Sequence, residues 1–120
     1  MSENYKILGK YIKDMSSETA DIETFLFVKD YISKYQLNID ITSKALKNKL
    51  VEINTTLKFE DKDENSKKSH FEIIFATIVR ISDQIKEKKD LQKIILCDVQ
   101  KEIYPDLEKS FLNLLHNSGY

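Results

Sequence analysis

The segment from Phe71 to Ile81 carries apolar side chains on both faces of the β-strand that its alternation predicts. One face carries Phe71, Ile73, Phe75, Val79 and Ile81. The other face carries Ile74, Ala76 and Ile78. A strand loses its polar face when both sides of the sheet are covered. A chain of 120 residues has little material for a second layer, so we expect another copy of the protein to contact Ile74, Ala76 and Ile78.

Three earlier segments also alternate between apolar and polar residues, namely Tyr5 to Ile12, Leu37 to Thr42 and Val51 to Phe59. Each is predicted to be a strand. The polar run from Asp61 to Ser69 is predicted to be the hairpin loop between the last two strands. With two glycines and one proline in 120 residues, we expect long elements joined by polar loops.

The first strand is predicted to place Tyr5, Ile7, Gly9 and Tyr11 on one face. Continued alternation then places Asp14 with Lys10 and Ile12 on the opposite, more polar face. We expect Asp14 and Glu18 to be exposed.

The remainder, from Asp90 to His116, has apolar residues at spacings of three and four, which predicts a helix. Pro105 predicts a kink or a restart within it, and Gly119 suits its C-terminal cap. Cys97 follows Ile94 by three residues, so we expect it to be a small buried core residue. The predicted fold is a single α+β domain over residues 1–120, with a four-stranded antiparallel sheet and a long kinked helix on one face.

The connection from Ser17 to Tyr35 does not alternate and is crowded with aromatic and aliphatic residues. It is either a short helix or an extended loop. Its apolar side chains either seal the edge of the sheet or form a groove for extended, apolar polypeptide.

The sequence offers little for catalysis. His70 and His116 lie far apart, and there is no glycine-rich phosphate loop or metal-ligand spacing. The acids at positions 61, 63 and 64 lack the spacing of a calcium loop. We therefore expect no enzymatic activity, no cofactor and no metal.

The net charge of −1, with Arg80 as the sole arginine, argues against nucleic-acid binding. No apolar run is long enough for a signal peptide or a membrane span. A single cysteine allows no intrachain disulfide. These features predict a cytoplasmic protein.

Several motifs resemble those of the SecB family of protein-export chaperones. Residues 11–18, YIKDMSSE, are similar to the family's Y-x-K-D-x-S-x-E signature. Residues 27–31, FVKDY, and the strand after them resemble the family's F-x-K-D-aromatic segment and second strand. Ile103-Tyr104-Pro105 and Ser118-Gly119-Tyr120 resemble elements inside and at the end of its first long helix.

The resemblance implies a homotetramer, a dimer of dimers, that holds unfolded preproteins in the cytoplasm and passes them to the motor ATPase SecA. It implies that Asp14 and Glu18 belong to an acidic patch that docks the motor. It also implies a client-binding groove lined by Leu26, Phe27, Tyr31, Tyr35, Leu37 and Ile39.

The sequence departs from the family pattern in four places. Leu107-Glu108 stands where the family has an arginine after the helix proline. Ile78-Val79 stands where the family has a glycine pair, and Ile74 stands at an acidic position of its fourth strand. The family continues beyond the position of Tyr120 into a second helix and an acidic tail. We therefore expect either a shortened homologue or a chaperone adapted to another partner. The alternative function is a non-catalytic oligomeric module that serves one dedicated partner, such as an adaptor or an antitoxin-associated chaperone.

Overall fold

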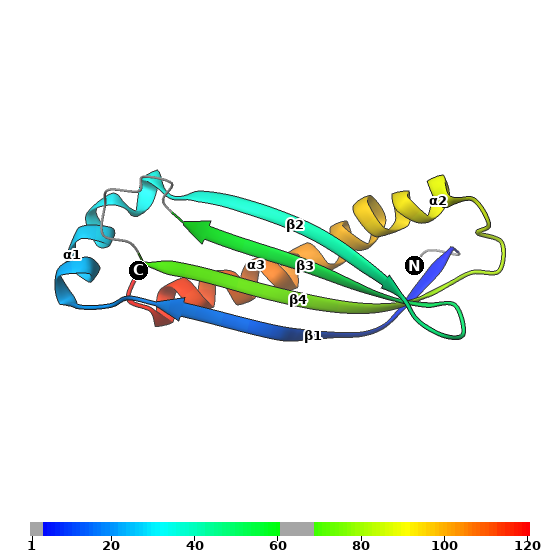
Figure 1. The fold of residues 1–120 in the computed structure, drawn as a ribbon, viewed down its shortest axis with the longest axis horizontal. Coiled ribbons are helices and arrows are strands. Elements are labelled where there is room, and N and C mark those ends of the chain that lie inside the picture. The colour runs from blue at the N-terminus through cyan, green and yellow to red at the C-terminus, as the bar shows by residue number, and fades with distance from the viewer. Residues whose placement is uncertain (1–3, 61–68) are drawn as a thin grey trace.

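The computed structural model describes residues 4–60 and 69–120. A four-stranded antiparallel sheet with strand order β1-β4-β3-β2 is covered along one face by the C-terminal helix (Figure 1). In chain order the elements are β1 (Tyr5–Glu18), α1 (Ile22–Tyr31), a 3-10 turn (Ile32–Lys34), β2 (Gln36–Ala45), β3 (Leu50–Glu60), β4 (His70–Ile81), α2 (Lys88–Lys93), a π-helical turn (Ile94–Asp98) and α3 (Val99–Asn117). The predicted α+β architecture is confirmed.

The two central strands, β3 and β4, follow the alternation of the sequence. In β3 the residues facing α3, which include Ile53 and Leu57, are buried, while their neighbours are partly exposed. β4 lies between β1 and β3, so its side chains have neighbours on both sides. The predicted β3–β4 loop, except for Ser69, lies outside the described residues.

The core lies between the sheet and the C-terminal helix. Every third or fourth residue of α3 is buried against it, from Val99 and Ile103 through Leu107, Phe111 and Leu114. Each of these large apolar side chains contributes about 1.5–3 kcal/mol to folding when it is removed from water. The helix is therefore held in place along the length of the sheet.

The predicted faces of β1 are wrong because two β-bulges interrupt its pairing with β4, one between Ile7 and Gly9 and one between Ile12 and Asp14. Each bulge inserts an extra residue and moves the following side chains to the opposite face. Lys10 consequently faces α3. Its ammonium group donates a 2.6 Å hydrogen bond to Asp106.

The same bulges place Tyr11 and Asp14 on the sheet face turned away from α3, opposite Ala76 and Ile74 of β4. We call this the open face. Tyr11 and Asp14 therefore share a face, whereas the alternation predicted opposite faces.

A π-helical turn, which no sequence pattern predicted, interrupts the C-terminal helix. Within it, the N–H of Val99 donates to the carbonyl of Ile94, five residues back. The side-chain amide of Gln100 donates to the carbonyl of Ile95 at 3.1 Å, and Thr55 of β3 donates to the oxygen of the same amide at 3.0 Å. A side chain and a neighbouring strand thus stabilise the wider turn.

The extra residue of the π-helical turn rotates the helix, so Ile94 and Ile95 are both buried while Cys97 is exposed. The prediction of a core cysteine is wrong for that reason. α3 continues through Pro105 without a restart, and the break in the helix lies at the π-helical turn instead.

The C-terminus closes α3 with a Schellman motif. Gly119, at a φ of 98°, donates to His116, and Tyr120 donates to Leu115 at 2.9 Å. The predicted role of Gly119 as a cap is confirmed. A Cβ on Gly119 would lie 2.7 Å from the ring of Phe25, so the close approach of α1 also requires glycine here.

Candidate functional site

The connection between the first two strands is a helix, which settles the alternative left open by its sequence. Asp21 caps α1, because its Oδ1 accepts a 2.7 Å hydrogen bond from the N–H of Thr24. Glu23 in the first turn and Lys29 in the last turn both suit the helix dipole.

One side of α1 is anchored to the end of the sheet. Thr24 and Val28 are buried, and the ring of Phe25 lies 5.2 Å from the ring of Tyr120. Tyr120 in turn contacts Phe71 of β4, with the ring centroids 5.5 Å apart. The C-terminal residue therefore links α1 to the sheet and fixes the position of the helix.

The other side of α1 exposes large apolar side chains, namely Ile22, Leu26, Phe27 and Tyr31. Leu26 is 56% exposed and Ile22 is 72% exposed. Phe27 and Tyr31 contact each other with ring centroids 4.6 Å apart, and Lys34 lies 4.8 Å from the Tyr31 ring. Water contacts apolar surface here that a monomeric protein would normally bury.

Two further exposed residues, Leu37 and Ile39, lie on β2 at the end of the strand nearest α1 (Figure 1). They pair with Phe59 and Leu57 of β3, so they lie on the face of the sheet that α3 covers elsewhere. β2 is an edge strand, and one row of its backbone groups lies at the edge of the sheet. We call Leu26, Phe27, Tyr31, Leu37 and Ile39 the apolar band.

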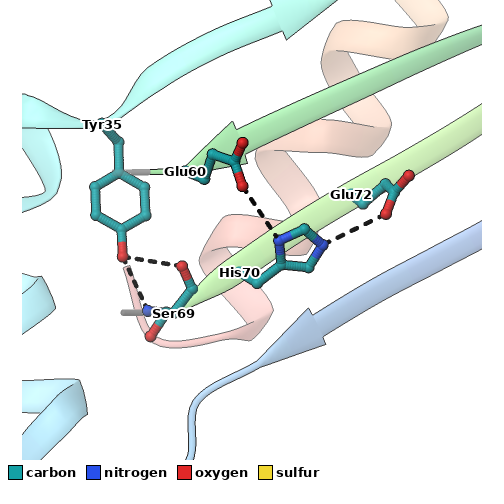
Figure 2. A network of polar contacts seen from close by, with 5 residues as sticks. All are labelled: Tyr35, Glu60, Ser69, His70 and Glu72. Carbon is teal, nitrogen blue, oxygen red and sulfur yellow. Dashed lines mark hydrogen bonds and ion pairs between the residues drawn. The ribbon is translucent and has the colours of Figure 1, made fainter. Parts of the chain in front are cut away.

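Tyr35 is the one predicted groove residue that lies in the core. Its ring packs 5.1 Å from that of Phe59, and its hydroxyl accepts from the N–H of Ser69 and donates to the carbonyl of Ser69, both at 2.9 Å (Figure 2). Tyr35 therefore joins the start of β2 to the start of β4 through its two hydrogen bonds with Ser69.

His70 directly follows Ser69, the hydrogen-bond partner of Tyr35, and lies near two carboxylates. Its Nδ1 lies 3.8 Å from Glu60 and its Nε2 lies 3.4 Å from Glu72 (Figure 2). These contacts are half-exposed ion pairs at most, which contribute little to stability. Within residues 4–60 and 69–120, no group of three or more His, Cys, Asp or Glu side chains could hold a metal ion.

Asp14 and Glu18 both lie on the open face and are exposed. Glu18 pairs with His70, and Ser16 between the two acids pairs with Glu72 of β4. Glu72 therefore adds a third carboxylate to this end of the open face. Sequence analysis missed it because the pairing of β1 with β4 depends on the bulges.

The predicted oligomer contacts lie on the same open face. Ala76 has no exposed surface in the single chain, and Ile74 and Ile78 are half-buried. Lys13 forms a 2.9 Å ion pair with Glu52, which bridges β1 and β3 over the central strand β4. This pairing lowers the pKa of Glu52, chiefly through the hydrogen bond from Lys13.

Sequence analysis also missed exposed apolar residues on the C-terminal helix, namely Leu96, Tyr104 and Leu112. They recur every eight residues, whereas the apolar residues that predict the buried face of the helix recur every three or four. No helix in the described part of the chain is long and apolar enough to cross a membrane.

Comparison with known proteins connects these features to a family. The family model described as "Preprotein translocase subunit SecB" matches residues 1–120. A curated protein of Pelagibacter ubique (strain HTCC1062), named "Putative protein-export protein SecB", is 60% identical over 120 residues, which cover 100% of this chain and 86% of that protein.

A solved structure has a similar fold. It is the Mycobacterium tuberculosis Rv1957 SecB-like chaperone in complex with a ChAD peptide from the Rv1956 HigA1 antitoxin. The TM-score is 0.68 at 9% sequence identity, and the match covers 98% of this chain and 85% of that one.

Proposed function

Because this chain belongs to the SecB family of protein-export chaperones, we propose that it is a cytoplasmic holdase that binds unfolded preproteins and delivers them to the export machinery. The observation that carries the proposal is the apolar band on α1 and β2, where large side chains remain in water on elements that are themselves firmly anchored.

The band suits an unfolded polypeptide in two ways. Its side chains bury client apolar groups, and each methylene removed from water contributes about 0.8 kcal/mol. The unpaired edge of β2 offers backbone hydrogen bonds to an extended segment, which would bind regardless of sequence. Neither contact needs a nucleotide or a metal. Tyr35 is buried, so it is not part of this contact surface.

The test is suppression of aggregation, measured by light scattering on several unrelated proteins diluted from denaturant. We expect the protein to suppress aggregation of all of them, and Leu37→Ser combined with Ile39→Ser to lose most of this effect. Leu112→Ser is the matched control, because Leu112 is 53% exposed on α3, outside the band. Equal loss in the control would contradict the location of the site.

A second candidate function is service to one dedicated partner. It is favoured by the similar fold of the SecB-like chaperone that was solved with an antitoxin peptide. The range of proteins that are protected from aggregation separates the two functions. A holdase acts on unrelated unfolded proteins, whereas a dedicated module protects one protein and fails with the others.

For delivery, we propose that Asp14 and Glu18, together with Glu72, present carboxylates to a basic surface on the SecA motor. Rim charges of this kind act mainly on association rate and salt dependence. Their exposure on a strand held by long pairing means that the surface needs no rearrangement to dock.

We propose homo-oligomerisation, as a dimer of dimers, with Ile74 and Ile78 supplying the contact and Ala76 the packing beneath. Asp14 and Ile74 are paired neighbours on the open face, so a second copy seated over Ile74 would also cover Asp14. SecA docking and a second copy over Ile74 would therefore exclude each other at Asp14. An oligomer contact centred on Ile78 would leave Glu18 accessible to the motor.

A further inference from the structure

The β2–β3 hairpin and α2 lie at the end of the molecule opposite α1 (Figure 1). A hollow of about 390 Å³ lies between them. We call it the hairpin pocket. It is lined by Ala45, Leu46, Lys49, Leu50, Val51, Ile81, Ser82, Ile85, Lys86, Glu87, Lys88 and Leu91. Its size falls within the range of about 300–1,000 Å³ that is typical of ligand pockets.

The wall of the pocket is apolar and incompletely covered. Leu46 is 39% exposed, and Leu50, Ile85 and Leu91 are half-buried. These four side chains come from the β2–β3 turn, β3, the β4–α2 connection and α2, so the tertiary fold is needed to bring them together. A large apolar side chain inserted here would remove surface from water on all sides.

The rim of the pocket is cationic. Three lysines and one glutamate line it. Lys49 is ion-paired with Asp83, whereas Lys86 and Lys88 have no ion pair among residues 4–60 and 69–120. The three lysines carry one more charge than the two carboxylates, Glu87 and Asp83. The rim therefore has an excess of one positive charge, and Lys86 and Lys88 are free to turn toward a ligand.

Lys49 lines the pocket from the tight turn of the β2–β3 hairpin. Asn48 and Lys49 occupy the two central turn positions with φ values of 62° and 61°, a conformation in which glycine is favoured at the second position. A side chain there costs about 1–2 kcal/mol. Strain of this kind is often retained where the side chain has a use.

From the apolar wall and the lysine rim together we propose that the hairpin pocket binds a peptide segment in which a large apolar side chain lies between carboxylates. The apolar side chain enters the pocket, and the flanking acids meet Lys86 and Lys88. This adds a ligand class to the proposed function and does not depend on the apolar band, which lies at the other end of a molecule 55 Å long.

The experiment is fluorescence anisotropy with two labelled, end-blocked peptides that share a central Phe-Leu pair, one flanked by aspartates and one by lysines. We expect the acidic peptide to bind more tightly and to weaken with salt, because the rim charges are exposed to screening. Lys86→Glu with Lys88→Glu should weaken the acidic peptide about tenfold, or about 1.4 kcal/mol, and should improve binding of the basic one.

Two controls make the result specific. Lys101→Glu with Lys109→Glu makes the same charge change on exposed positions of α3 and should leave both affinities unchanged. Leu46→Ser should weaken the acidic peptide without changing the preference between the two peptides, because it alters the wall and keeps the rim.

Equal binding of the acidic and basic peptides would overturn the inference, as would an unchanged affinity after the charge reversal. Competition by decanoate as effective as that by unlabelled acidic peptide would reassign the pocket to an apolar anion. The Leu37→Ser and Ile39→Ser variant should bind the acidic peptide normally. Failure of aggregation suppression with intact peptide binding would reject the holdase alone, and the reverse would reject the pocket alone.

Discussion

Tyr35→Phe is the substitution that best separates a structural role from a binding role at the candidate site. It removes only the hydroxyl that joins Tyr35 to both backbone groups of Ser69, and Ser69 is fully buried. The phenyl ring remains against Phe59 and Phe71, so no large cavity forms. The expected loss of stability is worked from the two hydrogen bonds to Ser69.

The expected loss follows from what is left unpaired. A buried backbone donor or acceptor without a partner costs about 1–3 kcal/mol, so the loss of both Ser69 partners should lower the free energy of unfolding by about 2–6 kcal/mol. For a domain of this size, each kcal/mol lowers Tm by about 3–6 °C. Urea titration followed by circular dichroism, at one fixed protein concentration, measures the change.

Tyr31→Phe is the matched control, since Tyr31 is 40% exposed. It should change stability by less than about 0.5 kcal/mol. Suppression of aggregation by Tyr35→Phe, measured well below its Tm, should equal that of the unmodified protein. A Tm unchanged by Tyr35→Phe would refute the reasoning, because Ser69 would then have other partners. Lost suppression at unchanged stability would return Tyr35 to the binding surface.

Four further outcomes are expected. Leu107→Ala should lower the free energy of unfolding by about 2–5 kcal/mol in a urea titration, because Leu107 is 2% exposed on the side of α3 that faces the sheet; a loss below about 1 kcal/mol would contradict this packing. Asp14→Lys with Glu18→Lys should leave Tm and aggregation suppression unchanged while weakening a complex with the SecA motor in a binding titration, and an unfolded double variant would show that the acids are structural. Ile78→Glu should dissociate the oligomer in size-exclusion chromatography with light scattering, and a monomeric unmodified protein would reject that interface. Cys97 should react with a thiol reagent at full rate without denaturant, because it is exposed, whereas protection would place a partner over this side of the helix.

Much of the fold could be predicted because its signals are local. The alternation of β3 places Ile53 and Leu57 on one face, and the helical spacing of Ile103 and Leu107 gives α3 its buried side. Period-two and period-3.6 patterns follow from backbone geometry alone, so they survive without knowledge of the partners. The cap at Gly119 is equally local, because it depends on a backbone conformation that glycine adopts readily.

The sequence also singled out the residues of the apolar band, through their excess of aromatic side chains and their family motifs. It could not separate Leu37, which is exposed, from Tyr35 two residues earlier, which is buried. Both are large residues at the start of one strand. Their difference arises because the hydroxyl of Tyr35 meets Ser69, 34 residues away, and no local pattern contains that contact.

The tertiary structure alone decided which side chains share a face wherever one residue is inserted into a regular element. The bulges of β1 put Tyr11 and Asp14 together on the open face, and the π-helical turn exposes Cys97. A one-residue insertion reverses a strand face or rotates a helix by about 100°. Such an insertion is stabilised by other elements, as Thr55 and Gln100 stabilise the π-helical turn. The sequence by itself therefore determined the four strands, the C-terminal helix and their order, and long-range contacts determined the faces that they present.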